Sequence, residues 1–201
     1  IKEEKAFANS LQLLGKGTLP ELVNIWDDEY TPLDIGEIFA DVTLLDLDSN
    51  EVAISTTDGK FRLISYIFTR CPMPSMCPAV ISKNLYLAKI FKDEPNIEFI
   101  LASFDYAYDT PSILKQTYGS LLEFSPNLKI LSSTGHSNDI LSLSGQSFVS
   151  FWGIEENDIG HTLRSVLIDP ERRLMTTFDG TDWRPEAAER DIRNIMRAYN
   201  L

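Results

Sequence analysis

Residues 61–78 read FRLISYIFTRCPMPSMCP, and this stretch decides the fold class. Its first part, 61–68, is rich in β-forming and apolar residues, as expected of a strand buried on both faces. A helix is predicted soon after it, over 79–91, because the apolar residues there recur on one helical face. The stretch therefore predicts a strand–loop–helix unit whose loop carries both cysteines of the chain, Cys71 and Cys77.

The same patterns predict strands and helices on both sides of this unit. The expected strands lie at 42–47, 52–55, 97–103, 128–131, 163–168 and 174–178, and the expected helices at 110–118, 137–149 and 185–199. Strands that alternate with helices predict a partly parallel sheet covered by helices on both faces, whereas the last two strands must be antiparallel. We therefore predict an α/β chain with a thioredoxin-like fold, in which a mixed central sheet follows an N-terminal β-hairpin extension.

We expect two parts along the chain. Residues 1–40 contain one helix-compatible segment, Glu4–Leu14, and then a stretch rich in Pro and Asp, which we interpret as an arm packed on the main domain. Residues 41–201 form that domain. Because the first residue is Ile rather than Met, we expect that an upstream signal peptide or membrane anchor has been removed.

Composition narrows the functional class. The 201 residues are 43% hydrophobic and 24% charged, which is ordinary for a soluble globular protein. The net charge is −12 and no basic cluster interrupts it, so a nucleic-acid partner is not expected. No window reaches the roughly 18 to 20 apolar residues that a membrane helix needs.

The cysteine loop carries the chemistry. Two cysteines are too few for a disulfide framework, and their spacing of six positions favours a site, although a structural disulfide or buried unreacted thiols are alternatives. A helix that begins near Pro78 and the cation of Arg70 are expected to lower the pKa of Cys77. Thiolates suit Cu(I); Met73 and Met76 could add thioethers, but methionines more often serve packing and are left out of the predicted site.

Two histidines are available as a third ligand. His136 lies in a polar turn ahead of a predicted helix, where an exposed or capping role is the ordinary interpretation. His161 directly precedes the predicted strand 163–168, which would hold it at a sheet edge. Judged from the residues alone, such a histidine is structural more often than it is a metal ligand.

Taken together, these segments resemble the Sco/SenC family of thioredoxin-fold copper-handling proteins over residues 41–199. The resemblance rests on a leading hairpin, a metal-binding loop, an Asp-rich segment and a histidine-bearing strand start. The corresponding residues are Asp41–Leu44 with Asp58–Lys60, Phe68–Pro78, Ser103–Asp105 with Asp109–Pro111, and Gly160–Leu163 with Leu167–Pro170. Three departures stand out: five residues separate the cysteines where the family usually has three, Gly160 replaces a common Asp, and Tyr106 replaces a common Pro.

The resemblance implies a copper site formed by Cys71, Cys77 and His161, with both cysteines also able to cycle between dithiol and disulfide. It implies delivery of copper, as Cu(I) or Cu(II), to the binuclear copper site of a respiratory cytochrome oxidase, or maintenance of that site's thiols. The implied partners are the copper-bearing oxidase subunit or another copper carrier, and a thiol reductant. The implied location is periplasmic or otherwise extracytoplasmic, with membrane anchoring through a missing N-terminal segment.

Two enzymatic alternatives remain beside this metallochaperone interpretation. Cys71 and Cys77 could serve a metal-independent thiol–disulfide oxidoreductase, but such enzymes carry a proline beside the disulfide, and no proline lies between Pro126 and Pro170. A peroxidase would need one cysteine to attack peroxide and the other to resolve it, and the nearby Arg70 and Thr69 are compatible with that chemistry but unspecific.

Overall fold

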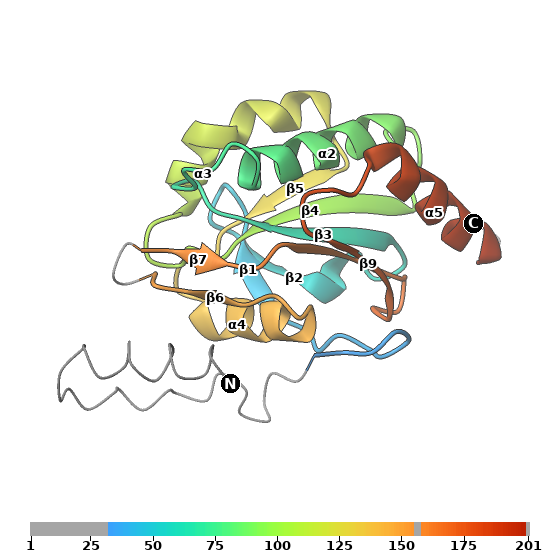
Figure 1. Ribbon diagram of the computed structural model, residues 1–201, viewed down its shortest axis with the longest axis horizontal. Coiled ribbons are helices and arrows are strands. Elements are labelled where there is room, and N and C mark those ends of the chain that lie inside the picture. Colours follow the sequence, from blue (N-terminus) through green and yellow to red (C-terminus); the bar gives the residue numbers. More distant parts are fainter. Residues whose placement is uncertain (1–31, 155–157, 200–201) are drawn as a thin grey trace, which may run out of the picture.

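A five-stranded mixed sheet forms the centre of the protein in the computed structural model, which describes residues 32–154 and 158–199 (Figure 1). The strand order is β5-β4-β3-β8-β9, where β3 is Phe61–Ile67, β4 Ile97–Ser103, β5 Leu128–Leu131, β8 Arg164–Ile168 and β9 Leu174–Asp179. β3, β4 and β5 are parallel, whereas β8 runs antiparallel to β3 and β9 antiparallel to β8. The predicted mixed sheet and its antiparallel final pair are confirmed.

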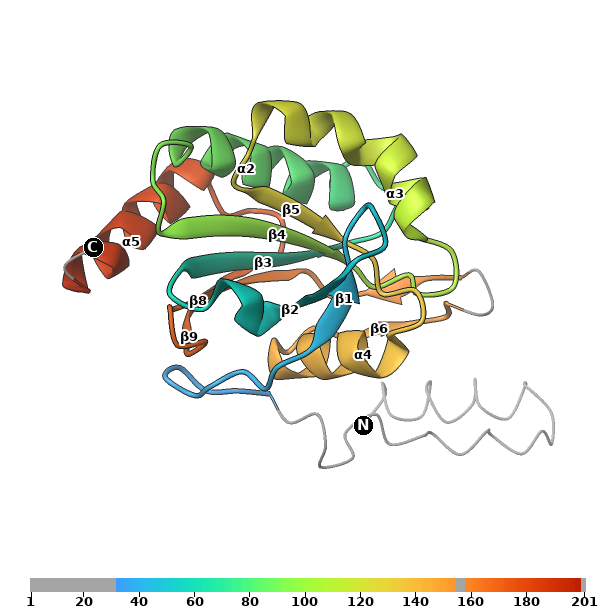
Figure 2. The same cartoon turned by 180° about the vertical axis from the view of Figure 1, so that it is seen from behind.

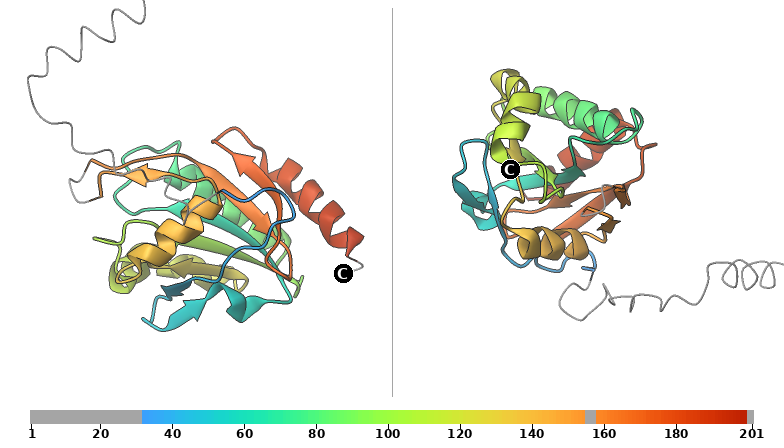
Figure 3. Two further views of the ribbon diagram at one scale, coloured as in Figure 1. Left: turned by 90° about the horizontal axis from the view of Figure 1, so that it is seen from below. Right: turned by 90° about the vertical axis from the view of Figure 1, so that its left-hand side faces the viewer.

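Helices cover both faces of this sheet. α2 (Cys77–Ile90), α3 (Pro111–Tyr118) and α5 (Pro185–Ala198) lie on one face, and α4 (Ser137–Gln146) lies on the other (Figures 1 and 2). The end-on view in the right panel of Figure 3 shows the sheet as a layer between them. Among the described residues, no helix has the length and apolar character needed to cross a bilayer.

The predicted hairpin precedes the sheet. β1 (Thr43–Leu45) pairs antiparallel with β2 (Glu51–Ala53), and a short 3-10 helix, η2 (Ile54–Thr57), follows. Leu45 and Ser132 exchange backbone hydrogen bonds of 2.9 and 2.7 Å, which attach the hairpin to the chain just after β5. The strand expected over 52–55 ends at Ala53, because η2 begins at the next residue.

Local capping signals proved reliable, whereas some short elements were missed. α3 begins at Pro111, and the Thr110 side chain accepts the Ile113 amide at 3.3 Å, as the sequence predicts. The helix expected over 137–149 ends at Gln146, because Phe148 adopts a positive φ of 56° that a helix does not contain. The sequence did not predict the 3-10 helix η3 (Gly119–Phe124) or the two-residue strands β6 (Phe151–Trp152) and β7 (Gly160–His161).

Residues 32–40 lie along the outer edge of the sheet. The Gly36 amide donates to the Leu174 carbonyl at 2.7 Å, and the Leu174 amide donates to the Glu37 carbonyl at 2.9 Å. Phe39 is fully buried in the core. The helix expected over 4–14 lies outside the described residues, and the division of the chain at residue 41 stays a prediction.

One buried charge departs from the apolar strand that the sequence predicted. Arg62 in β3 is completely buried, and its guanidinium donates to the carbonyls of Ile54 and Asp169, each at 2.8 Å. It also forms an ion pair of 2.8 Å with the half-exposed Asp58. The side chain therefore joins η2 to the chain just after β8, at the opposite end of β3 from Cys71.

We expect Arg62→Leu to lower the free energy of unfolding by about 2 to 4 kcal/mol, because it removes the two buried hydrogen bonds of the guanidinium and its ion pair with Asp58. Urea denaturation followed by circular dichroism measures this change. Arg190→Leu is the matched control, since the Arg190 side chain is 70% exposed on α5, and it should change stability little. Equal stability of the two variants would contradict the role given to Arg62.

Candidate metal centre

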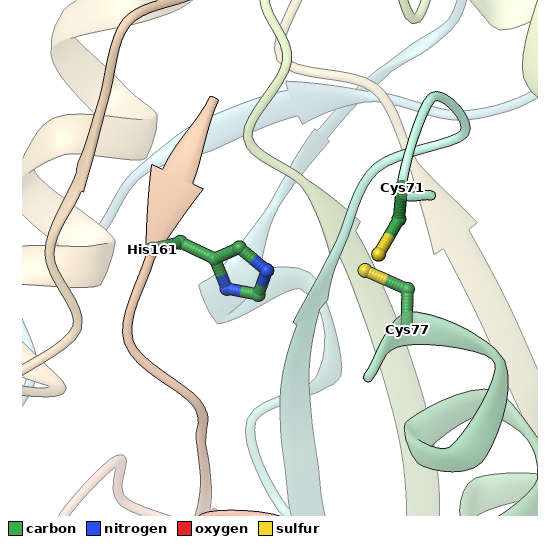
Figure 4. Close-up of side chains that lie close together, drawn as sticks. All are labelled: Cys71, Cys77 and His161. Carbon is green, nitrogen blue, oxygen red and sulfur yellow. The ribbon is translucent and has the colours of Figure 1, made fainter. Parts of the chain in front are cut away.

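Three potential metal ligands meet beyond the carboxyl end of β3. Cys71 lies in the loop after this strand, Cys77 is the first residue of α2, and His161 belongs to β7 (Figure 4). The two sulfurs and a ring nitrogen of His161 all lie within 4.8 Å of one another. The structure thus brings together the three residues that the sequence singled out, and both cysteines are free thiols.

The five-residue spacing does not keep the sulfurs apart. The loop turns back on itself, with the Met76 amide donating to the Met73 carbonyl at 3.0 Å. Cys71 Sγ also lies 3.7 Å from the Met73 carbonyl, to which the thiol donates. Met73 in this loop is 49% exposed, and Met76 is half-buried.

The His161 ring is prepared to donate an electron pair. Its Nδ1 lies 2.9 Å from the Thr162 carbonyl oxygen, and because a carbonyl only accepts, Nδ1 carries the proton. Nε2 therefore keeps its lone pair, and it is buried without a hydrogen-bond partner. Figure 4 shows this nitrogen on the side of the ring that faces the two sulfurs. Burial also lowers the pKa of His161, which favours the neutral imidazole that binds metals.

Aromatic packing holds the imidazole in place. The ring meets Phe68 edge-on with centroids 5.4 Å apart, and it lies 5.1 Å from the Phe104 ring. Both phenylalanines are buried and directly follow β3 and β4. The sheet therefore supplies a rigid apolar floor on which the histidine rests.

The expected lowering of the Cys77 pKa is wrong. Cys77 is fully buried, and this desolvation raises the pKa of its thiol, although a hydrogen bond with the Phe68 backbone acts in the opposite direction. The Arg70 guanidinium, which was expected to help, binds Asp105 through Nε and Nη2 at 2.8 and 3.0 Å. Burial therefore outweighs the Phe68 hydrogen bond and favours the protonated thiol of Cys77.

The donor set fits a soft metal ion. Two sulfurs and one neutral imidazole suit Cu(I) or Zn²⁺, and a bound ion would displace the thiol protons. The unpartnered Nε2 is the specific sign of such a ligand, because a buried acceptor without a donor costs about 1 to 3 kcal/mol. A metal ion on the sulfur side would satisfy that nitrogen.

Two buried aspartates hold the start of the cysteine loop. Asp109 accepts hydrogen bonds from the Thr69 amide at 2.8 Å, from the Thr69 hydroxyl, and from the Ser103 hydroxyl at 2.6 Å. Burial raises the pKa of Asp109 despite these donors. Asp105 pairs with Arg70, so the two residues before Cys71 are both anchored. The sequence marked this Asp-rich segment but did not reveal its positioning role.

The second histidine is not part of the site. His136 precedes α4, and its Nδ1 lies 3.5 Å from an Asp139 carboxylate oxygen. It makes no side-chain cap to the helix, and it is absent from the group of potential ligands found among residues 32–154 and 158–199. His136 stands at the N-cap position of α4, but its side chain is only 19% exposed and makes no cap hydrogen bond, so the exposed or capping role expected from the sequence is not confirmed.

Comparison with known proteins decides the family. The sequence profile of SCO1/SenC matches residues 31–197. The chain belongs to the SCO1/SenC family. It is 26% identical over 164 residues to the mitochondrial protein Sco2 of Saccharomyces cerevisiae, a match that covers 78% of this chain and only about half, 52%, of the yeast protein.

Solved structures of Sco proteins share the fold. Copper-bound ScoI of Bradyrhizobium japonicum is 27% identical with a TM-score of 0.60, covering 79% of this chain and 99% of that one. BsSco, described as having a disulfide switch and as a member of the Sco family of cytochrome c oxidase assembly proteins, is 21% identical with a TM-score of 0.63. That match covers 84% of this chain and 97% of BsSco. The likeness confirms the predicted thioredoxin-like α/β class.

We expect Asp109→Asn to loosen the cysteine loop, because the amide cannot accept all three hydrogen bonds that the carboxylate accepts. The free energy of unfolding should fall by about 1 to 3 kcal/mol, and the Thr69 amide should exchange its hydrogen faster. Native-state hydrogen exchange with NMR detection measures both. Asp93→Asn is the control, since the Asp93 side chain is 89% exposed. Similar exchange rates of the Thr69 amide in both variants would refute the role of Asp109 in holding the loop.

Proposed function

We propose that this protein binds copper through Cys71, Cys77 and His161 and serves the assembly of a respiratory cytochrome oxidase, delivering copper to its binuclear copper site. The observation that carries the proposal is the buried, unpartnered Nε2 of His161, which faces two free thiols within 4.8 Å. Membership of the SCO1/SenC family and the copper-bound relative support it.

The three candidate ligands differ in protonation and in exposure to solvent, and these differences give them different roles in copper binding and release. Burial lowers the pKa of His161 and so favours its neutral form, whereas burial raises the pKa of Cys77, whose thiol would lose its proton to copper. Cys77 is fully buried whereas Cys71 is partly exposed, so Cys71 is the sulfur at which an incoming carrier can begin ligand exchange. Two thiolates and one imidazole accommodate Cu(I) or Cu(II), and copper leaves as cargo when the partner's ligands replace them one at a time.

A thiol redox role is the second candidate. Two free thiols in one loop favour it, and BsSco is described as having a disulfide switch. In this reaction Cys71 and Cys77 become a disulfide, and their two electrons and two protons reduce a disulfide in the copper-bearing oxidase subunit. A thiol reductant would then return the pair to the dithiol state.

We propose an extracytoplasmic location with membrane tethering, in keeping with the mitochondrial yeast relative. The net charge of −12 supports a carrier that concentrates cations around itself and selects a partner of complementary charge. The docking partner would be the oxidase subunit that receives copper or another copper carrier.

Titration of the reduced protein with Cu(I) and, separately, Cu(II) tests the copper proposal. We expect one ion per chain, and we expect His161→Ala to weaken binding by more than about 100-fold, beyond the effect of losing only a supporting hydrogen bond. His136→Ala is the matched control, because it removes the other histidine of the chain, and it should bind as the unaltered protein does. Stoichiometric binding by His161→Ala at unchanged affinity would refute the site.

Oxidation of the cysteine pair should abolish copper binding, because a disulfide removes both thiolate ligands. We expect the oxidised protein to bind less than a tenth of an equivalent of Cu(I), about the level left by incomplete oxidation, and a dithiol reductant to restore full binding. Mass spectrometry of alkylated protein reports the thiol state. Full Cu(I) occupancy of the oxidised protein would exclude the sulfurs as ligands.

A further inference from the structure

The short hairpin that carries His161 has two different faces. β6 pairs antiparallel with β7, so that Phe151 lies opposite His161 and Trp152 lies opposite Gly160. Because side chains alternate along a strand, the first pair shares one face and the second pair shares the other. Phe151 stacks on the buried Phe104 at 4.9 Å with the ring planes 14° apart, so the Phe151–His161 face points into the protein.

On the outer face, the Trp152 indole lies directly over Gly160. A Cβ atom added to Gly160 would lie 2.3 to 2.5 Å from three indole atoms, Cε2, Cζ2 and Nε1. The backbone of Gly160 is not in the left-handed region, so the glycine is needed for space rather than for its conformation. The indole is half in solvent, because Trp152 is 55% exposed.

The register of this short hairpin is also restrained by the stack of Phe151 on Phe104 and by a hydrogen bond of 3.1 Å from the Asp158 amide to the Gly153 carbonyl. Each strand has two residues, and the pair forms a sheet of its own outside the central five strands. Beyond it, the Thr162 amide donates to the Ser150 carbonyl at 2.9 Å, and the Ser150 amide donates to the Thr162 hydroxyl at 3.0 Å. An isolated two-stranded hairpin is marginally stable, and a slip of one residue reverses the direction of every side chain. Such a slip would turn the His161 imidazole toward solvent.

We propose that Trp152 and Gly160 form a packing lock that holds the register of β6 and β7 and thereby places His161 against the two sulfurs. Trp152 is then a positioning residue for the metal centre, and Gly160 is the space it requires. The flat indole fits only over a residue without a side chain, so it selects the one register in which His161 points inward. This inference rests on the proposed function only where copper affinity is used as a readout.

A double-mutant cycle on metal-free and copper-loaded protein tests the lock. Gly160→Ala should weaken copper binding by about 10- to 100-fold, the range for loss of a ligand's support, because the new methyl group collides with the indole. In the metal-free protein, NMR should show loss of the proton contacts between the His161 ring and Phe104. Trp152→Ala should also weaken copper binding and reduce these proton contacts, but less than Gly160→Ala does. The double variant, Trp152→Ala with Gly160→Ala, should show the copper affinity and ring contacts of Trp152→Ala alone.

Two controls match these substitutions. Gly119→Ala places a Cβ 3.5 Å from the flexible Lys115 side chain, an ordinary contact, and Phe124→Ala removes an aromatic ring that is 80% exposed. Both should leave the His161 ring contacts and copper affinity unchanged.

The outcomes separate the lock from the copper site. Unchanged ring contacts and copper affinity in Gly160→Ala, or a double variant no better than Gly160→Ala, overturn the lock. If Gly160→Ala does not fold, Trp152→Ala decides, since intact ring contacts in that variant overturn the lock as well. If the unaltered protein binds no copper, the proposed function fails, whereas the ring contacts in the metal-free variants still decide the lock.

Discussion

The pairing of β3 on both sides is the constraint from which the site follows. All seven residues of this strand are buried; it pairs with β4 over its full length, from Phe61 with Ile97 to Ile67 with Ser103, and with β8 on the other edge. Parallel pairing in this register makes β3 and β4 end at the same height. The Phe104 amide then donates to the Ile67 carbonyl at 3.2 Å, and the two following segments leave the sheet together. The cysteine loop and the Asp-rich segment meet because the two strands stop together.

This constraint explains what the sequence could predict. A buried strand, an amphipathic helix and a capping threonine are local signals, and each produced its element within a few residues of the expected bounds. The candidate ligands could be named because their types are rare in this chain, with two cysteines and two histidines. Their proximity was implied by a family resemblance and not by spacing, because nothing local to His161 refers to a loop some 90 residues earlier.

The features that were missed depend on partners distant in the sequence. β6 and β7 have two residues each, too few for a periodic pattern, and their pairing depends on packing against Phe104. In the sequence, Arg62 is a charged residue in an otherwise apolar strand, and nothing nearby shows how its charge is satisfied. Its acceptors lie in η2 and at Asp169. The pKa of Cys77 was misjudged for the same reason: the helix start is visible in the sequence, but the burial that raises the pKa is not.

The centre draws its ligands from parts of the fold with different local stability. The sulfurs lie at the end of the central sheet and on α2, whereas the imidazole lies on a hairpin that makes few hydrogen bonds. Such a hairpin can open while the sheet stays folded, because local unfolding costs less than global unfolding. If an ion were held by the three residues, opening of the hairpin would withdraw the imidazole and leave the two sulfurs in place. That opening would leave the five-stranded core folded, because the hairpin forms a sheet of its own.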